Sequence, residues 1–97
     1  MGWTLITGAS EGLGREFADL AAAEGRGVIL SARQEDKLQA LAADLRGRYG
    51  VEVVVIPADL AMPGEPERLW TAATDGREID VLVNNAGLGR NGEFADP

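Results

Sequence analysis

The sequence predicts an α/β fold built on a doubly wound parallel sheet. Two observations carry this prediction. Short apolar segments alternate with amphipathic ones along the 97 residues, and a glycine-rich turn joins the first such pair. Because alternating strands and helices form parallel sheets with right-handed crossovers, we expect the strand order 3-2-1-4. A ligand should then lie at the carboxyl ends of the strands, near strands 1 and 4.

The first half of the chain supplies two strand–helix pairs. A buried strand at 3–6 precedes a helix that follows the glycine-rich turn, and a strand at 28–32 precedes a helix over about 34–46. The residues expected on one side of the first helix are Leu13, Phe17, Leu20 and Ala21. The buried stripe expected on the second helix consists of Leu38, Leu41, Ala42 and Leu45.

The second half of the chain repeats the alternation. The β-branched run 51–56 predicts a third strand, which Pro57 ends. A helix over about 65–74 follows, and a nearly continuous apolar run at 79–83 suits a strand of a parallel sheet covered on both faces. The inner residues expected on this third helix are Leu69, Ala72 and Ala73. Residues 1–97 are expected to form a single domain.

The turn at residues 7–14 gives the first indication of function. Its glycines have the spacing G-x-x-x-G-x-G, and a strand-to-helix turn of this kind can hold a phosphate on free backbone N–H groups. Gly8 can let the chain turn off the strand, Gly12 can leave room for a diphosphate, and Gly14 can let the helix approach the sheet closely. An ordinary glycine-rich loop is the alternative. No Gly-Lys-Ser/Thr follows, so the turn is not a P-loop.

Arg33 comes directly after the second strand, where an acidic residue would hold the ribose hydroxyls of NAD. An arginine there suits the 2′-phosphate of NADP instead, because a guanidinium pairs well with phosphate. The alternative is a solvated arginine that starts a helix. Glu11 is an objection to NADP, since a carboxylate turned inward from the phosphate loop would repel a phosphorylated ribose.

Two further groups of residues follow the third and fourth strands. The Asp59 carboxylate could accept a hydrogen bond from an adenine amino group, with Leu60 against the base, or Asp59 could order the loop before the third helix. Asn84, Asn85 and Gly87 lie at the end of the fourth strand. Asparagine side chains can tie neighbouring loops together and glycine permits close approach of a ligand, although the same residues also favour a simple turn.

Taken as a set, these motifs resemble those of the short-chain dehydrogenase/reductase family. They are Thr7-Gly8-Ala9-Ser10-Glu11-Gly12-Leu13-Gly14, Ser31-Ala32-Arg33, Asp59-Leu60 and Asn84-Asn85-Ala86-Gly87. The resemblance implies a Rossmann-type fold that binds NAD(P)(H), and Arg33 makes NADP the expected cofactor, with NAD the lesser alternative. It implies an oxidoreductase that transfers hydride between the cofactor and a carbonyl/alcohol pair.

The resemblance also implies a role for each motif. Ser10, Glu11, Leu13 and the three glycines of the turn would surround the diphosphate, and Arg33 would select NADP. The residues implied at adenine are Asp59 and Leu60, and those implied at the adenosine ribose are Asn84, Ala86 and Gly87.

The residues that this family uses for proton transfer are missing. The resemblance implies a tyrosine with a lysine four residues later, but the only tyrosine is Tyr49, with Val53 four residues on. The only lysine is Lys37, and Tyr49 is expected to pack instead. We therefore expect the chain to be inactive alone, as the front part of a Rossmann domain cut after its fourth strand. A non-catalytic nucleotide-binding or assembly module is the alternative.

The composition limits the partners. A net charge of -7 disfavours nucleic acid and anionic membranes, and no apolar run is long enough to cross a bilayer. Without histidine there is no histidine base or metal ligand, and the absence of cysteine and of a signal-peptide pattern favours the cytoplasm. The fourth strand should be an open edge. We expect it to pair antiparallel with a second copy in a two-fold homodimer with a continuous eight-stranded sheet.

Overall fold

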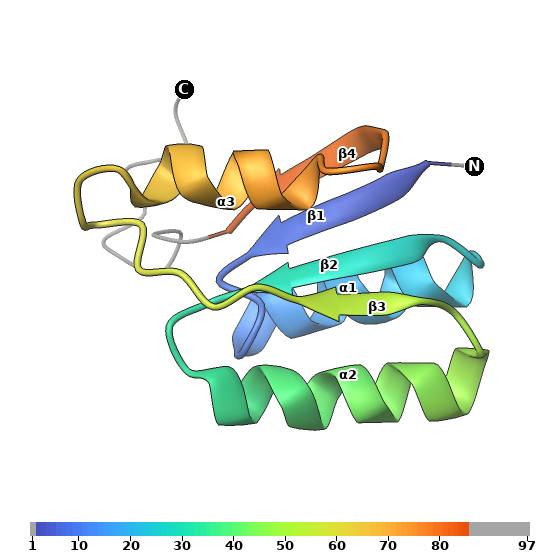
Figure 1. Cartoon of the computed structure of the whole chain (residues 1–97). Coiled ribbons are helices and arrows are strands. Elements are labelled where there is room, and N and C mark those ends of the chain that lie inside the picture. The colour runs from blue at the N-terminus through green and yellow to red at the C-terminus, as the bar shows by residue number, and fades with distance from the viewer. Residues whose placement is uncertain (1, 86–97) are drawn as a thin grey trace.

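The computed structural model describes residues 2–85, so the expectations for Ala86 and Gly87 lie outside the described residues. Within this part, four parallel strands form one sheet of order β3-β2-β1-β4, which confirms the predicted order (Figure 1). The strands are β1 (Trp3–Thr7), β2 (Gly27–Ser31), β3 (Val53–Val55) and β4 (Ile79–Asn84). The helices between them are α1 (Gly12–Ala23), α2 (Glu35–Tyr49) and α3 (Glu65–Ala73).

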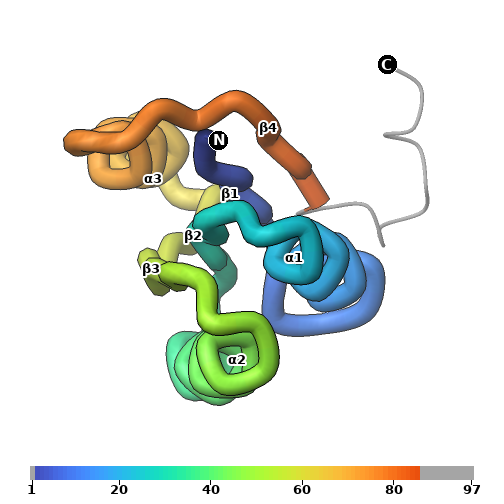
Figure 2. Tube along the Cα trace, turned by 90° about the vertical axis from the view of Figure 1, so that its right-hand side faces the viewer, coloured from blue at the N-terminus to red at the C-terminus, as the bar shows by residue number. Residues whose placement is uncertain are grey.

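The sheet has helices on both faces. Figure 2 shows α1 and α2 on one side and α3 on the other. Two buried clusters match these layers. One packs the α1 and α2 side chains against Ile6, Val28 and Leu30, and the other packs Leu69 and Ala73 of α3 against the opposite face of the sheet. Side chains alternate between the two faces along a strand, so consecutive residues within β1, and likewise within β2, pack into different clusters.

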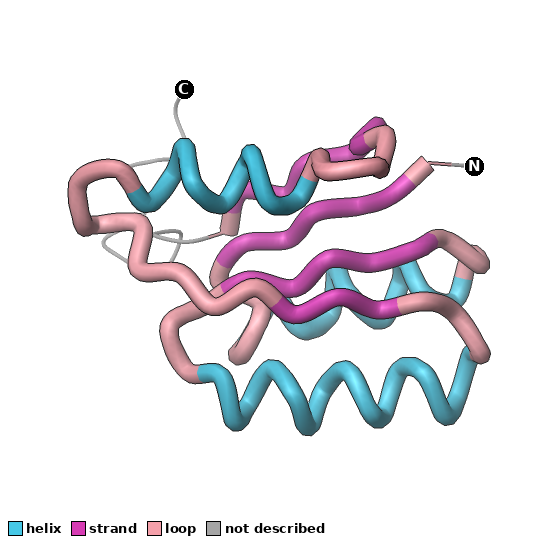
Figure 3. Tube along the Cα trace, in the orientation of Figure 1, coloured by secondary structure: helices cyan, strands magenta, loops and turns pink. Residues whose placement is uncertain are grey.

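The register brings the carboxyl ends of three strands together. Thr7 of β1 pairs with Ser31 of β2 on one side and with Asn84 of β4 on the other. The loops that leave these strands therefore gather at one edge of the sheet, on the left in Figure 3. This carboxyl edge contains every residue that the sequence assigned to the ligand site and that the structure describes.

The predicted buried face of α1 is wrong in part. Leu13 and Leu20 are 55% and 61% exposed, although Ala21 is buried and Phe17 packs partly against the core. The residues of α1 that are buried are Gly14, Ala18, Ala21 and Ala22. Small residues on this face allow the helix axis to lie close to the sheet, and the larger leucines are then turned outward.

The other two helices bury the predicted residues. The stripe of α2 is buried as expected, and Leu69 and Ala73 of α3 are buried with Ala72 packed partly against them. β3 is shorter than the predicted 51–56. Hydrogen bonding to β2 nevertheless continues past its end, from Ile56 and Ala58, so the chain still follows β2 toward the carboxyl edge.

β4 is the open edge of the described sheet. Its neighbour is β1, and α3 packs onto Leu5 and Ile29 rather than over the middle of β4. Val81 and Leu82 are consequently 41% and 53% exposed, although such an apolar run suits a strand covered on both faces. Within residues 2–85, no helix combines the length and apolar character needed to cross a bilayer.

Candidate functional site

The loop between β1 and α1 turns sharply across the end of β2. Gly8 has a φ of 64°, the left-handed conformation expected of the residue that leaves the strand. The next residue, Ala9, is buried and donates its backbone N–H to the carbonyl oxygen of Ser31 at 3.1 Å. Glu11 precedes α1 without a capping side-chain hydrogen bond. The first N–H groups of α1 are thus left without a cap from that side chain, an arrangement that suits an anion.

Gly14 is required by the packing of this loop. A Cβ atom at Gly14 would overlap the carbonyl oxygen of Gly8 and would lie 2.8 Å from Nδ2 of Asn85. Gly12 differs, since a Cβ there would have nothing within 4 Å, although its φ of 56° still favours glycine. The close approach predicted for Gly14 is therefore confirmed, and the surface beside Gly12 is open to a ligand.

The end of β4 is tied to the same loop by two asparagines. Asn84 Oδ1 accepts a hydrogen bond from Thr7 Oγ1 at 3.1 Å, and Asn85 Nδ2 donates to the Gly8 carbonyl at 3.1 Å. This confirms that the asparagines join neighbouring loops. Asn85 was not among the predicted site residues, although its place beside Asn84 at a strand end was the available signal. Its Oδ1 atom is buried without a hydrogen-bond partner among the described residues.

Arg33 is an uncommitted cation at the carboxyl edge. It is exposed, two residues after the end of β2, and makes no hydrogen bond or ion pair within residues 2–85. Ser31, two residues earlier, is 1% exposed, so the arginine leaves a strand end that is fixed in the core. The guanidinium is therefore free to receive an anionic group.

A second cation of this region was missed by sequence reasoning. Lys37, in the first turn of α2, places Nζ 2.7 Å from Oε2 of Glu11. The hydrogen bond and charge of Lys37 lower the pKa of Glu11 below its usual value. The only lysine of the chain, four residues after Arg33, was the signal that could have drawn attention to it. The Glu11 carboxylate, which was the objection to NADP binding, thus forms an ion pair with Lys37 of α2.

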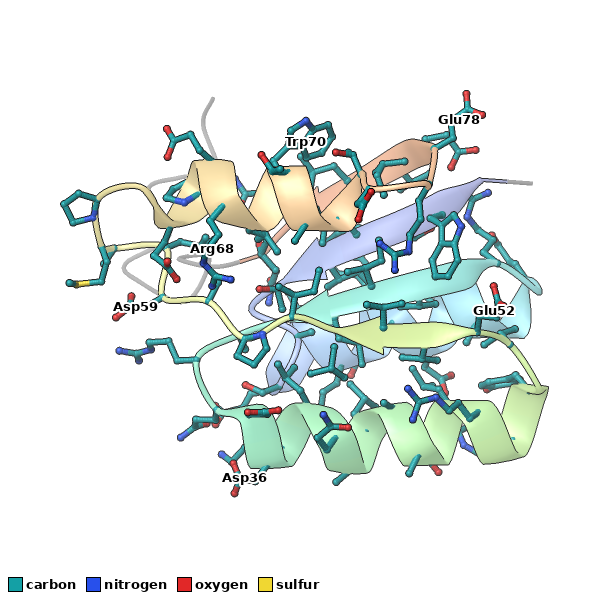
Figure 4. All side chains as sticks on the ribbon, viewed as in Figure 1. Asp36, Glu52, Asp59, Arg68, Trp70 and Glu78 are labelled. Carbon is teal, nitrogen blue, oxygen red and sulfur yellow. The ribbon has the colours of Figure 1, made fainter. Side chains whose placement is uncertain are left out.

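Asp59 orders the loop after β3. Its Oδ1 atom accepts a hydrogen bond from the backbone N–H of Ala61 at 3.0 Å, and its carbonyl accepts one from Met62. Leu60 packs partly against the cluster under α3. Figure 4 shows Asp59 on the side of the molecule where the strands end. The loop-ordering alternative is therefore realised, and contact with adenine stays a prediction.

Tyr49 lies at the opposite edge of the sheet. It ends α2, packs partly against the core, and hydrogen-bonds through its hydroxyl to Asp19 at 3.0 Å and to Arg48 at 2.9 Å. Lys37 lies twelve residues earlier on the same helix, which corresponds to roughly 18 Å along its axis. The packing role expected of Tyr49 is confirmed, and the structure does not bring Tyr49 and Lys37 together.

A parallel sheet of order 3-2-1-4, with a glycine-rich turn after its first strand and polar residues at its carboxyl edge, defines a dinucleotide-binding type of α/β protein. The family model for short chain dehydrogenases matches residues 2–97. The chain therefore belongs to the short-chain dehydrogenase family, as its sequence motifs indicated.

Similar proteins agree with this assignment. A 7beta-hydroxysteroid dehydrogenase of Collinsella aerofaciens is 40% identical over 94 residues, which are 97% of this chain and 35% of the relative. A ketone-specific alcohol dehydrogenase from Comamonas testosteroni has a TM-score of 0.85 at 34% identity, with 100% of this chain and 39% of that chain covered. A short-chain dehydrogenase from Sphingobium yanoikuyae in complex with NADPH has a TM-score of 0.79 at 36% identity, with 84% and 32% covered. The chain thus spans about a third of the length of these proteins.

Proposed function

We propose that this chain binds NADP(H) at the carboxyl edge of its sheet, as the cofactor-binding part of an oxidoreductase. The parent reaction is reversible hydride transfer between NADP(H) and a carbonyl/alcohol pair, in which the cofactor supplies the hydride. The observation that carries the proposal is the uncommitted guanidinium of Arg33, two residues after the end of β2. Similar solved structures that are complexes with NADPH or NADP support the same choice.

The described residues fit such a cofactor. Gly8 turns the chain off β1, the surface beside Gly12 is open, and the N-terminus of α1 offers a diphosphate N–H groups that the Glu11 side chain does not cap. Arg33 would pair with the 2′-phosphate. The other residues proposed to contact the cofactor are Ser10, Glu11, Leu13, Gly14, Asp59, Leu60 and Asn84, with Ala86 and Gly87 beyond the described part.

The work of these residues is to bind and orient. A general acid must reach the reacting oxygen, and Tyr49 is held by Asp19 and Arg48 at the other edge of the sheet. We therefore propose that the 97-residue chain binds the dinucleotide without turnover. Steady NADPH consumption by the pure chain with any ketone would contradict this.

The cofactor assignment is tested by comparing the dissociation constants of NADPH and NADH by calorimetry. NADPH should bind more tightly, and Arg33→Ala should remove about tenfold to a hundredfold of that preference, as expected for a charge-assisted pair with phosphate. Arg46→Ala is the charge control, since it removes the same charge near the C-terminus of α2, far from Arg33; it also removes a hydrogen bond to the Val53 carbonyl. Equal affinities for the two dinucleotides in the unaltered chain would refute the NADP assignment.

A second candidate function is a non-catalytic nucleotide-binding or assembly module. The observation that favours it is the distribution of the only tyrosine and the only lysine, which lie at opposite ends of α2. Such a module would bind dinucleotide. It would stay inactive within a full protein that contains this chain. NADPH oxidation by that full protein, with a tyrosine and lysine at the family's spacing, would decide for the enzyme.

We also propose that the isolated chain forms a two-fold dimer along β4. The strand is an edge of the described sheet and exposes Val81 and Leu82, which favours pairing with another copy. Sedimentation velocity should show a dimer that Leu82→Lys weakens. Leu20→Lys, at a leucine of α1 that is 61% exposed, should leave the dimer unchanged. A folded monomer at high concentration would contradict the dimer.

A further inference from the structure

We infer that Lys37 is a second determinant of coenzyme preference and acts by neutralising Glu11 in the phosphate-binding turn. This inference rests on the proposed binding of NADP(H), and it adds a residue that the binding turn and Arg33 do not contain. Lys37 contacts Glu11 rather than the cofactor, so it is a positioning residue.

The problem that Lys37 solves is the charge of Glu11. Glu11 directly precedes α1, and its side chain is 66% exposed at the turn where phosphates are expected. Phosphate groups and a free carboxylate repel each other, and the repulsion grows with the charge of the ligand. A dinucleotide with a 2′-phosphate carries more negative charge than one without it, so a free Glu11 would disfavour NADP(H) more than NAD(H).

The ion pair removes this charge from the turn. Nζ of Lys37 lies 2.7 Å from Oε2 of Glu11 and reaches it from the first turn of α2, the helix that begins two residues after Arg33. The pair links the β1–α1 turn to the segment that carries Arg33. It holds the carboxylate toward α2 and leaves the guanidinium of Arg33 without a carboxylate partner among the described residues.

Two more acidic residues, Glu35 and Asp36, lie in the first turn of α2, and neither takes the place of Glu11. Oε2 of Glu35 accepts a hydrogen bond from Gln39 along α2, at 3.4 Å. Figure 4 shows Asp36 on the outer side of α2, pointing away from the sheet. Among the described residues, Glu11 is therefore the carboxylate of this region whose position depends on Lys37.

Loss of Lys37 should lower the affinity for the phosphorylated ligand by either of two routes. The released carboxylate can repel the 2′-phosphate, or it can pair with Arg33 and compete with the phosphate for the guanidinium. Both routes act mainly on the ligand that carries the extra phosphate. Both also require Glu11, so removal of the carboxylate should abolish the effect of losing Lys37.

The test is a double-mutant cycle on the full chain with adenosine 2′,5′-bisphosphate and AMP as calorimetric probes. Lys37→Gln should reduce the preference for the bisphosphate about twofold to fivefold, the size expected for one exposed ion pair. In the Glu11→Gln background the same substitution should change nothing, and Lys37→Arg should retain the preference. Arg46→Gln, which removes a cation elsewhere on α2, is the control. High salt should shrink the effect.

The outcomes separate the two proposals. If Lys37→Gln weakens both probes equally, or acts equally without Glu11, the inference fails, while an effect of Arg33→Ala on the preference would leave the NADP assignment standing. If Arg33→Ala leaves the preference unchanged, or if neither probe binds, the NADP assignment fails and the inference fails with it. Circular dichroism of each variant shows that a loss of binding is not a loss of fold.

Discussion

The inner strands and the β4 edge of the sheet differ in how completely they are buried. Ile6, Ile29 and Leu30 on β1 and β2 are entirely buried between the helix layers, whereas Val81 and Leu82 on β4 are about half exposed. The residue types are alike, so the difference comes from the neighbours. The turn between β1 and α1 is therefore supported mainly by β1, β2, α1 and α2, and hardly by the middle of β4.

β4 contributes to the site through its carboxyl end. Asn84 and Asn85 hydrogen-bond to Thr7 and Gly8, and at the other end of the strand Asp80 forms an ion pair with Arg26. The strand is thus attached at both ends, although its centre is exposed. Burial and attachment are separate properties of this edge, and substitutions can address each of them.

The largest expected difference between the two regions concerns apolar truncation. Leu38→Ala on α2 removes a fully buried side chain and should lower the free energy of unfolding by about 2–5 kcal/mol. Leu82→Ala, at a leucine that is 53% exposed in the single chain, should cost less than about 1 kcal/mol at protein concentrations low enough to keep the chain monomeric. Urea unfolding followed by fluorescence of Trp3 and Trp70 measures both. Equal costs under these conditions would contradict the exposure of the centre of β4 in the single chain.

Glycine substitution gives the next largest contrast. Gly14→Ala forces a Cβ atom onto the Gly8 carbonyl, and the adjustment should cost about 1–3 kcal/mol and weaken dinucleotide binding. Gly47→Ala, at an exposed position of α2 with nothing within 4 Å, should instead stabilise the protein by about 0.5–1 kcal/mol. Thermal unfolding compares the two. A Gly14→Ala protein of unchanged stability would mean that α1 can move away from β1 at little cost.

The features predictable from sequence are those set by local pattern. Alternating segments gave the strand order, and leucine spacing gave the buried stripe of α2. The same reasoning failed on α1, where it placed Leu13 and Leu20 inside. Hydrophobicity favours leucine in the core, but close packing of a helix on a sheet selects the face with the smallest side chains. The sequence of one helix does not show whether hydrophobicity or close packing decides which face is buried.

The residues of the candidate site also divide into those set by local pattern and those that depend on distant contacts. The positions of Gly8, Gly12, Gly14 and Arg33 near the carboxyl ends of the strands could be predicted, because backbone geometry and strand ends are local properties. Lys37 was missed, and for Asn85 only a general loop-tying role could be given, since each acts through a partner far along the chain, Glu11 and Gly8 respectively. Contacts of that kind depend on how the loops meet at the sheet edge, which only the folded structure defines.

The attachment of β4 at its carboxyl end should be measurable separately from its burial. Asn85→Ala removes the hydrogen bond to the Gly8 carbonyl and should cost about 1 kcal/mol. Asn84→Ala, at an exposed residue, should cost less because water can replace its contact with Thr7. Hydrogen exchange of the amides in the turn at 8–12 should rise more in the first variant. Unchanged exchange there would mean that Asn85 does not hold the turn.

The smallest expected effect is a pH dependence that distinguishes α3 from α2. The hydrogen bonds of Arg68 lower the pKa of Glu65, and those of Arg48 lower the pKa of Asp44. A carboxyl group whose pKa is lower in the folded state adds stability above its unfolded pKa, and that stability is lost as the pH falls through the folded value. The Glu65 pair should therefore weaken as the pH falls below about 4.5, and the Asp44 pair as it falls below about 3.8.

The two ion pairs differ in whether the arginine has a second carboxylate partner. Arg48 contacts both Asp44 and Asp19, so Asp44→Asn leaves a second carboxylate for the guanidinium. Among the described residues, Glu65 is the one carboxylate paired with Arg68, which also binds the Pro57 carbonyl at the end of β3. Glu65→Gln should consequently flatten the acid side of the stability curve more than Asp44→Asn does. Urea midpoints at several pH values between about 6 and 3 would show this, and equal slopes for the two variants would contradict it.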